Sequence, residues 1–202
     1  MSAIAALCGR ATGVHARARL AGILAAMPGR GANPRIHQAT AAHPEAGAVL
    51  GVIGHEWEDA AVQDGAVGIA VSGPSTLVAD ATLVHRSDLL RAIESRGGHI
   101  AQGASDAALI LAALDSHGDA GIALLEGDFA FILHDAVSGR VVAARDFAGR
   151  RSLFHARVGD ELYLATTLNG LVSDPAIPRT LDLVSLTTVA AGLWSHAPET
   201  AY

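Results

Sequence analysis

The chain is short and acidic: its 202 residues carry 14 basic and 20 acidic side chains, and half of all residues are apolar. This length fits one sizeable domain, and the apolar content excludes a disordered acidic segment. The basic residues are all scattered arginines, no stretch reaches the roughly 18 unbroken apolar residues of a membrane-spanning helix, and no secretory signal opens the chain. We therefore expect a cytoplasmic protein that binds neither nucleic acid nor membrane.

The first eighty residues show mostly strand-like patterns. A short apolar run predicts a strand at 3–7, and apolar residues at helical spacing predict a helix over 15–27, which Pro28-Gly29 ends. Prolines and glycines predict a loop over 28–47. Three further apolar runs, the last two joined by a Ser-Gly-Pro-Ser turn, predict strands at 48–53, 66–71 and 76–80.

The rest of the chain alternates helices with hairpins. Ser87 and Ser105 are the predicted N-caps of two helices, and Gly97-Gly98 ends the first of them. Paired strand patterns joined by glycine-bearing turns predict two hairpins, at 128–135 with 140–145 and at 152–156 with 161–166. A final helix is predicted over 181–193.

The strand at 129–133 is apolar on both of its faces. Aromatic and aliphatic residues alternate along it without a polar side, and a sheet that is buried on both faces must be covered on both sides. Hairpins combined with a few helices then predict an α+β fold in which two antiparallel sheets stack with helices outside. No linker divides the chain, so residues 1–202 are expected to form one domain.

The second half of the chain carries motifs in a fixed order: S-D at 105–106, L-E-G-D-F-A-F at 125–131, A-R-D-F-A-G-R-R-S-L-F at 144–154 and G-D-E-L-Y-L-A-T at 159–166. This series resembles the glutaminase domain of asparagine synthetase and its relatives, whose motifs are a Ser-Asp pair, an L-x-G-x-F-A-F strand and an A-R-D-x-x-G-x-(K/R)-P-L-Y-Y hairpin. The resemblance covers essentially the whole chain. It implies the N-terminal-nucleophile hydrolase fold, a four-layer αββα sandwich.

Enzymes of this family hydrolyse glutamine and pass ammonia to a second domain, which adenylates a carboxylate with ATP. Their nucleophile is a cysteine directly after the initiator methionine, and its free α-amino group serves as the general base. In this chain Ser2 occupies the nucleophile position. A serine hydroxyl is a weaker nucleophile at neutral pH than a thiol.

The resemblance also implies that the glutamine pocket is degenerate. The family's oxyanion-hole Asn-Gly pair aligns with Asp80 and Ala81, and a carboxylate would repel the oxyanion that an amide stabilises. Loss of one such donor raises a barrier by roughly 2.7–4 kcal/mol. The arginine that would clamp the glutamine carboxylate aligns with the apolar stretch 50–53, so that only Asp106 of the substrate-binding set is kept. We therefore expect no glutaminase activity.

Degenerate domains of this kind occur in relatives that use an amine already present on the substrate, such as β-lactam synthetases and lasso-peptide macrolactam synthetases. The pattern D-A-x-L-x-x-R-x-x-L at 80–89 is similar to the lasso-peptide cyclases. The resemblance implies an N-terminal domain that itself holds no cofactor, followed after 192–202 by a synthetase domain that uses ATP and Mg. The expected partners are that C-terminal synthetase domain, a precursor peptide and a leader peptidase.

Some single residues allow two interpretations. Asp106 either binds a substrate amine or, in the first turn of its helix, complements the helix dipole or caps it. Arg145 with Asp146 either holds the hairpin junction or faces the partner domain. Cys8 is interpreted as a small core residue rather than an alternative nucleophile. The ten histidines lack the spacing of metal ligands, so no metal site is expected.

Two other functions stay open. The chain is then either a working glutamine amidotransferase domain, part of a glutamine-hydrolysing asparagine synthase that uses Ser2, or a freestanding structural or peptide-binding module. Glutamate release that depends on Ser2 would favour the amidotransferase.

Overall fold

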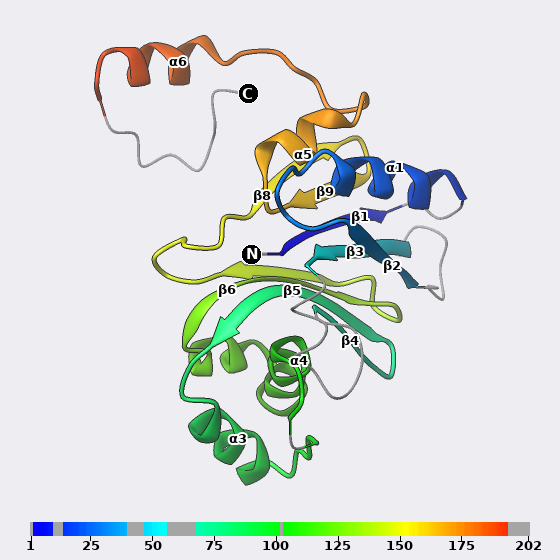
Figure 1. Cartoon of the computed structure of the whole chain (residues 1–202), viewed down its shortest axis with the longest axis vertical. Coiled ribbons are helices and arrows are strands. Elements are labelled where there is room, and N and C mark those ends of the chain that lie inside the picture. Colours follow the sequence, from blue (N-terminus) through cyan, green and yellow to red (C-terminus); the bar gives the residue numbers. More distant parts are fainter. Residues whose placement is uncertain (1, 10–13, 40–46, 56–67, 102, 194–202) are drawn as a thin grey trace.

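Two antiparallel sheets lie face to face between two layers of helices in the computed structural model of the chain (Figure 1). The structure describes residues 2–9, 14–39, 47–55, 68–101 and 103–193. The four layers confirm the predicted α+β sandwich, and within the described residues every strand pair is antiparallel.

The first sheet has the strand order β2-β3-β1-β9-β8. Its strands are, in chain order, β1 Ala3–Gly9, β2 Asn33–Ala39, β3 Gly47–Gly54, β8 Phe154–Val158 and β9 Glu161–Ala165. Helices α1, Val14–Ala25, and α5, Leu168–Ser173, cover its outer face. Leu20 and Leu24 of α1 pack there against Leu7 and other buried residues of the sheet. Burial of each such side chain contributes about 1.5–3 kcal/mol to folding.

The second sheet has the order β4-β5-β6-β7. Its strands are β4 Ile69–Ser72, β5 Ser75–Leu83, β6 Gly127–Asp135 and β7 Val141–Arg145. Among the described residues, three helices cover its outer face, namely α3 Arg86–Ser95, α4 Asp106–His117 and the short 3₁₀ helix η2 Gly118–Leu124. By length and composition alone the continuous helical stretch Asp106–Leu124 is apolar enough to cross a membrane, a test that core helices of globular proteins also pass. Its Leu109 and Ile110 are buried in the core beneath β5.

Alternation along the strands fills the layer between the two sheets. Ile4 and Ala6 of β1 meet Val78 of β5 and Ala130 and Ile132 of β6 in this inner core. Because successive side chains of a strand point to opposite faces, Ser2 and Asp80 also point into this layer. The pattern therefore places one residue from each sheet at the same end of the sandwich.

Some elements differ from the sequence prediction. Strand β2 lies inside the segment 28–47, which the sequence predicted to be a loop. The strand was not predicted because it is an edge strand whose mixed, partly exposed side chains lack an apolar pattern. Helix α3 begins at Arg86 with His85, not Ser87, as its N-cap, and His85 has the left-handed φ of 50° with no side-chain cap bond. Helices α5 and η2 were not predicted, since each is only six or seven residues long.

Helix α6, Leu183–Ala190, stands away from the sandwich in Figure 1. Asp182 caps it by accepting hydrogen bonds from the backbone N–H groups of Val184 and Ser185, both at 3.1 Å. No residue of this helix is buried. The predicted helix 181–193 is thus confirmed with tighter bounds, whereas residues 194–202 of the expected exit segment lie outside the described residues.

Candidate functional site

A hydrogen bond joins the two sheets at the end of the inner layer where β1 begins. The Ser2 hydroxyl donates to Asp80 Oδ1 over 2.8 Å. Ser2 is 4% exposed and Asp80 3% exposed, so that this bond is shielded from water. The structure thus brings together two of the residues that the sequence placed at the nucleophile and oxyanion-hole positions.

The start of β1 is held by the end of β9. The backbone N–H of Ile4 donates to Thr166 Oγ1 at 3.1 Å, and the N–H of Thr166 donates back to the Ile4 carbonyl at 3.0 Å. The Ser152 hydroxyl donates to the Thr166 carbonyl at 2.7 Å. These bonds fix the backbone two residues from Ser2 and so fix the direction of its side chain.

Two arginines that the sequence analysis did not assign to the site lie beside the pair. Arg151 Nε is 3.7 Å from Asp80 Oδ1, and a terminal nitrogen of Arg30 donates to the Ser2 carbonyl at 3.4 Å. Burial nevertheless raises the pKa of Asp80, although the Ser2 hydroxyl and the arginines oppose the shift. Arg151 stands at the K/R position of the family motif, which was the signal that could have found it, whereas Arg30 had none.

Asp146 anchors the loop that carries Arg151. Its carboxylate accepts from the backbone N–H groups of Arg150 and Arg151, both at 3.0 Å, and of Phe129 at 3.3 Å. Burial acts to raise the pKa of this carboxyl, but these backbone bonds together hold it below its ordinary value. Asp146 therefore has the structural role at the hairpin junction. The guanidinium of Arg145 lies over Gly149, whose φ is 65°.

Asp106 is bound within the protein, near the end of β5. Its carboxylate accepts from the Arg86 guanidinium and, at 3.1 Å, from the backbone N–H of Leu83. Ser105, as predicted, is the residue that caps α4, since its hydroxyl accepts from the N–H of Ala108 at 3.2 Å. Asp106 is therefore not the cap itself, but it lies in the first turn of α4, where its negative charge complements the helix dipole, as the sequence analysis also expected.

The other positions aligned with the family's glutamine pocket, Ala81 and the stretch 50–53, hold apolar residues that pack in the protein core. Ala81 pairs with Phe129 in the β5–β6 ladder and packs against the helical layer, on the face opposite to Asp80. Leu50 and Val52 of the stretch 50–53 are fully buried in the inner core. At Gly51 an added Cβ would lie 2.8 Å from Leu24 Cδ1, so α1 packs directly on this strand.

Cys8 is buried, and desolvation raises the pKa of its thiol to about 12, which matches its interpretation as a core residue. It lies six residues along β1 from Ser2, about 20 Å at the rise of a strand. In the described part of the chain, no group of three or more His, Cys, Asp and Glu side chains is arranged to hold a metal ion.

Comparison with known proteins extends this description. A family model described as a glutamine amidotransferase domain matches residues 68–202. Over 71 residues, 35% of this chain, the sequence is 35% identical to amidase chyE of Penicillium rubens, and the match covers 11% of that protein. The chain thus spans about a tenth of this curated relative.

Two solved structures share the fold. Glutamine phosphoribosylpyrophosphate amidotransferase from B. subtilis matches with a TM-score of 0.64 and 16% identity, over 85% of this chain and 43% of that chain. An allosteric regulatory enzyme of purine biosynthesis matches with a TM-score of 0.63 and 17% identity, with the same coverage. These likenesses identify the sandwich as the N-terminal-nucleophile hydrolase fold of class II amidotransferases. Because the family model covers more than half of the chain, the chain belongs to the glutamine amidotransferase domain family.

Proposed function

We propose that this chain is the N-terminal, non-hydrolysing glutaminase-like domain of an ATP-dependent enzyme that forms amide bonds, specifically a lasso-peptide macrolactam synthetase. The observation that carries the proposal is the buried hydrogen bond from the Ser2 hydroxyl to Asp80. A carboxylate, which only accepts hydrogen bonds when ionised, stands where the family places a donor.

Amide hydrolysis at Ser2 would need donors directed at the oxyanion of the tetrahedral intermediate. The Asp80 carboxylate next to Ser2 Oγ would instead place a second negative charge beside that oxyanion. At an effective dielectric constant of 20, two unit charges 4 Å apart repel by about 4 kcal/mol. The repulsion adds to the barrier that the missing amide donor already leaves.

The amine-binding position is also occupied within the chain. The carboxylate of Asp106 already binds the Arg86 guanidinium and the Leu83 N–H. A free amino acid would have to displace an intramolecular cation whose effective concentration is high. The apolar strand β3 offers no cation for a substrate carboxylate at 50–53. These features support a domain that is retained as a scaffold.

In the proposed enzyme, the synthetase domain activates an Asp or Glu side chain of the precursor peptide as an acyl-adenylate, with ATP and Mg bound in that domain. The N-terminal amine of the peptide closes the ring, so no ammonia is needed. The present domain would support the synthetase domain and contact the precursor peptide or the leader peptidase in the cytoplasm.

A second candidate, a working glutamine amidotransferase domain that uses Ser2, is favoured by one observation. Ser2 Oγ is 2.8 Å from a carboxylate whose pKa is raised by burial, and such a group is able to accept the hydroxyl proton as Oγ attacks an amide carbon. The relative from Penicillium rubens is named an amidase.

Glutamate release from glutamine by the full-length protein distinguishes the two candidates. We expect no release above that of the Ser2→Ala variant, together with ATP-dependent loss of water from a precursor peptide. Release that Ser2→Ala abolishes would instead support the working glutamine amidotransferase domain. Glutamine hydrolysis by the Asp80→Asn variant tests the donor argument directly, because this change restores an amide at the aligned position.

A further inference from the structure

Strand β8 forms an open edge of the first sheet. It lies last in the strand order, and among the described residues its backbone pairs with β9 alone. Because the hydrogen bonds of an antiparallel ladder alternate between the two sides of a strand, half of the N–H and C=O groups of β8 are directed away from β9. The edge strand on the other side, β2, carries Pro34, which cannot donate, whereas β8 contains no proline. The main chain of β8 is therefore able to pair with an added strand.

An apolar groove follows this edge on the outer face of the sheet. The half-buried side chains of Phe154, Ala156 and Val158 alternate along β8 and pack on that side. The groove is also lined by residues of α5 and by Ile177 and Pro178. Its volume is about 140 Å³, similar to the roughly 150 Å³ of an apolar cavity that holds one benzene molecule. The groove therefore has room for one aliphatic side chain of an added strand.

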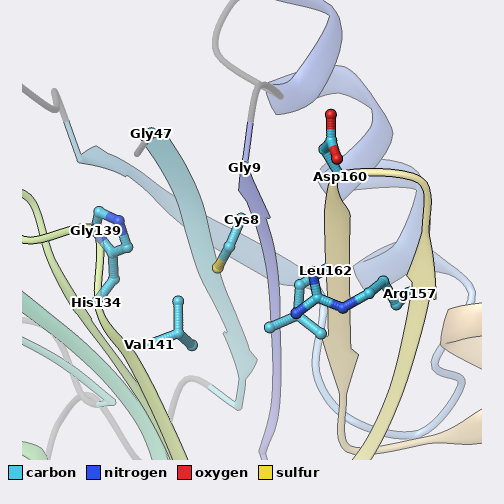
Figure 2. A pocket seen from close by; sticks show the side chains of 9 residues that line it. All are labelled: Cys8, Gly9, Gly47, His134, Gly139, Val141, Arg157, Asp160 and Leu162. Carbon is cyan, nitrogen blue, oxygen red and sulfur yellow. The ribbon is translucent and has the colours of Figure 1, made fainter. Parts of the chain in front are cut away.

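The inner face of β8 carries positive charge. His155 and Arg157 alternate with the apolar residues and are exposed, because the second sheet packs chiefly against β1 and β3. Figure 2 shows the Arg157 side chain on this inner face, beside Leu162 of β9. Arg179 is exposed near the groove, where its Nε donates to the Val172 carbonyl at 3.0 Å. The described lining of the groove contains no acidic residue, although the chain has a net charge of −6.

These charges argue against a second copy of this chain as the occupant of the edge. Two β8 strands paired antiparallel about Ala156 would place His155 of each copy opposite Arg157 of the other. No opposite charges would meet in such a pair, and like charges directly opposite each other destabilise a sheet. An acidic residue opposite Arg157 would instead have its Cβ about 4.5–5.5 Å from that of Arg157, within reach of an ion pair.

We propose that the β8 edge binds an extended peptide segment in which acidic residues alternate with aliphatic ones. The peptide backbone pairs with β8, and one aliphatic side chain enters the groove beside Ala156. The acidic side chains lie on the inner face with His155 and Arg157. Main-chain pairing supplies the affinity, and the apolar and cationic faces supply the selectivity. The proposal goes beyond the function proposed above and requires no reaction at Ser2.

Fluorescence anisotropy of a fluorescein-labelled Glu-Val-Glu-Val-Glu-Val amide, titrated with the purified chain, tests the proposal. We expect saturable binding of this peptide, and at least tenfold weaker binding when lysine replaces glutamate or serine replaces valine. Two further peptides carry N-methyl groups on all glutamate amides or on all valine amides. Because alternate N–H groups of a strand point to the same edge, one of these two peptides should lose binding and the other should keep it.

Two substitutions in the chain test the two faces separately, and thermal unfolding confirms that each variant folds. Arg157→Glu should weaken binding of the Glu-Val peptide at least tenfold and strengthen binding of the Lys-Val peptide. Val172→Glu places a charge at the groove and should also weaken binding of the Glu-Val peptide at least tenfold. The matched controls are Arg96→Glu, exposed at the end of α3, and Val137→Glu, 65% exposed after β6. Both controls should bind the Glu-Val peptide as the unaltered chain does.

Three results would overturn the proposal directly: no saturable binding, equal binding of the two N-methylated peptides, or a folded Arg157→Glu variant with unchanged charge preference. Sedimentation of the chain without peptide tests the alternative occupant. A dimer that Val172→Glu dissociates would assign the β8 edge to a second copy of the chain and would overturn the proposal as well.

Discussion

The Ser2–Asp80 hydrogen bond can be tested by its contribution to stability. Ser2→Ala removes the hydroxyl and leaves Asp80 Oδ1 without its donor, since the nearest cation atom, Arg151 Nε, is 3.7 Å away. A hydrogen bond to a charged group contributes about 1.5–3 kcal/mol, and a buried acceptor left unpaired carries the full desolvation cost. We expect the free energy of unfolding to fall by about 1.5–3 kcal/mol at pH 7.

A double-mutant cycle separates this bond from other effects of the substitution. In an Asp80→Asn background the same Ser2→Ala change removes only a neutral hydrogen bond and should cost about 0.5–1.5 kcal/mol. Unfolding by urea, followed by circular dichroism, gives all four values. Ser95→Ala is the matched control, because its hydroxyl donates to the Ala92 carbonyl in an exposed turn and its loss should change stability by less than about 0.5 kcal/mol.

The pH dependence follows from the direction of the Asp80 pKa. Burial raises this pKa above its value in the unfolded chain, so ionised Asp80 lowers stability above the unfolded pKa, and protonation relieves that cost as the pH falls. The Ser2 hydroxyl lowers the pKa and thus acts on the ionised form. The cost of Ser2→Ala should therefore shrink as the pH falls through the folded pKa of Asp80. An unchanged free energy of unfolding in Ser2→Ala, or one equally reduced at neutral and acidic pH, would refute the reasoning.

Three further predictions concern the residues around the site. Asp146→Asn should lower the free energy of unfolding by roughly 2–3 kcal/mol above pH 5, because the Asp146 carboxylate accepts three backbone hydrogen bonds. The difference from the unaltered chain should vanish as the pH falls through the lowered pKa of Asp146. Urea unfolding at several pH values measures this. At pH 8, iodoacetamide should alkylate Cys8 at least a hundredfold more slowly in the folded protein than in urea, because a pKa of about 12 leaves only about 10⁻⁴ of the thiol as thiolate. Mass spectrometry can follow the alkylation. Equal rates in the folded and unfolded protein would contradict the burial of Cys8. Arg86→Ala should lower the free energy of unfolding by only about 1 kcal/mol, since the ion pair of Arg86 with Asp106 is partly exposed. It should nevertheless speed hydrogen exchange of the Leu83 amide, which donates to Asp106. Unchanged exchange would show that the ion pair does not order the backbone at the end of β5.

Much of the sandwich could be predicted because side chains along a strand alternate between its two faces with a period of two residues. The run at 129–133, apolar on both faces, correctly required a layer on each side of the second sheet, and both hairpins followed from their turns. Strand β2 was not predicted, because the side chains of this edge strand are only partly buried and Arg35 and His37 interrupt the apolar pattern. Local patterns thus find buried strands and miss those that depend on a neighbour for their pairing.

The candidate site shows the same division. The motif alignment located Ser2, Asp80 and Asp106, but no sequence pattern reveals that Ser2 donates to Asp80 across 78 positions or that Arg86 occupies Asp106. These contacts depend on how two sheets stack and on where α3 begins. A left-handed His85 immediately before Arg86 is the local feature that sets this start, and it had no sequence signal beyond a single histidine.

The arrangement of charges explains how the chain can hold carboxylates at the Asp80 and Asp106 positions and keep its fold. In the proposed scaffold, Asp80 remains near Arg151 and hydrogen-bonded to Ser2, while Asp106 remains bonded to Arg86, so both of these carboxylates have a partner from the chain itself. A buried carboxylate with no partner would cost several kcal/mol, which the net stability of a domain cannot absorb. Replacement of a substrate-facing donor by a carboxylate is therefore tolerated only where the chain supplies the hydrogen bond itself. On this argument, the hydrogen bond from Ser2 lowers the cost of burying the Asp80 carboxylate, whereas the half-buried Asp106 depends less on its partner Arg86.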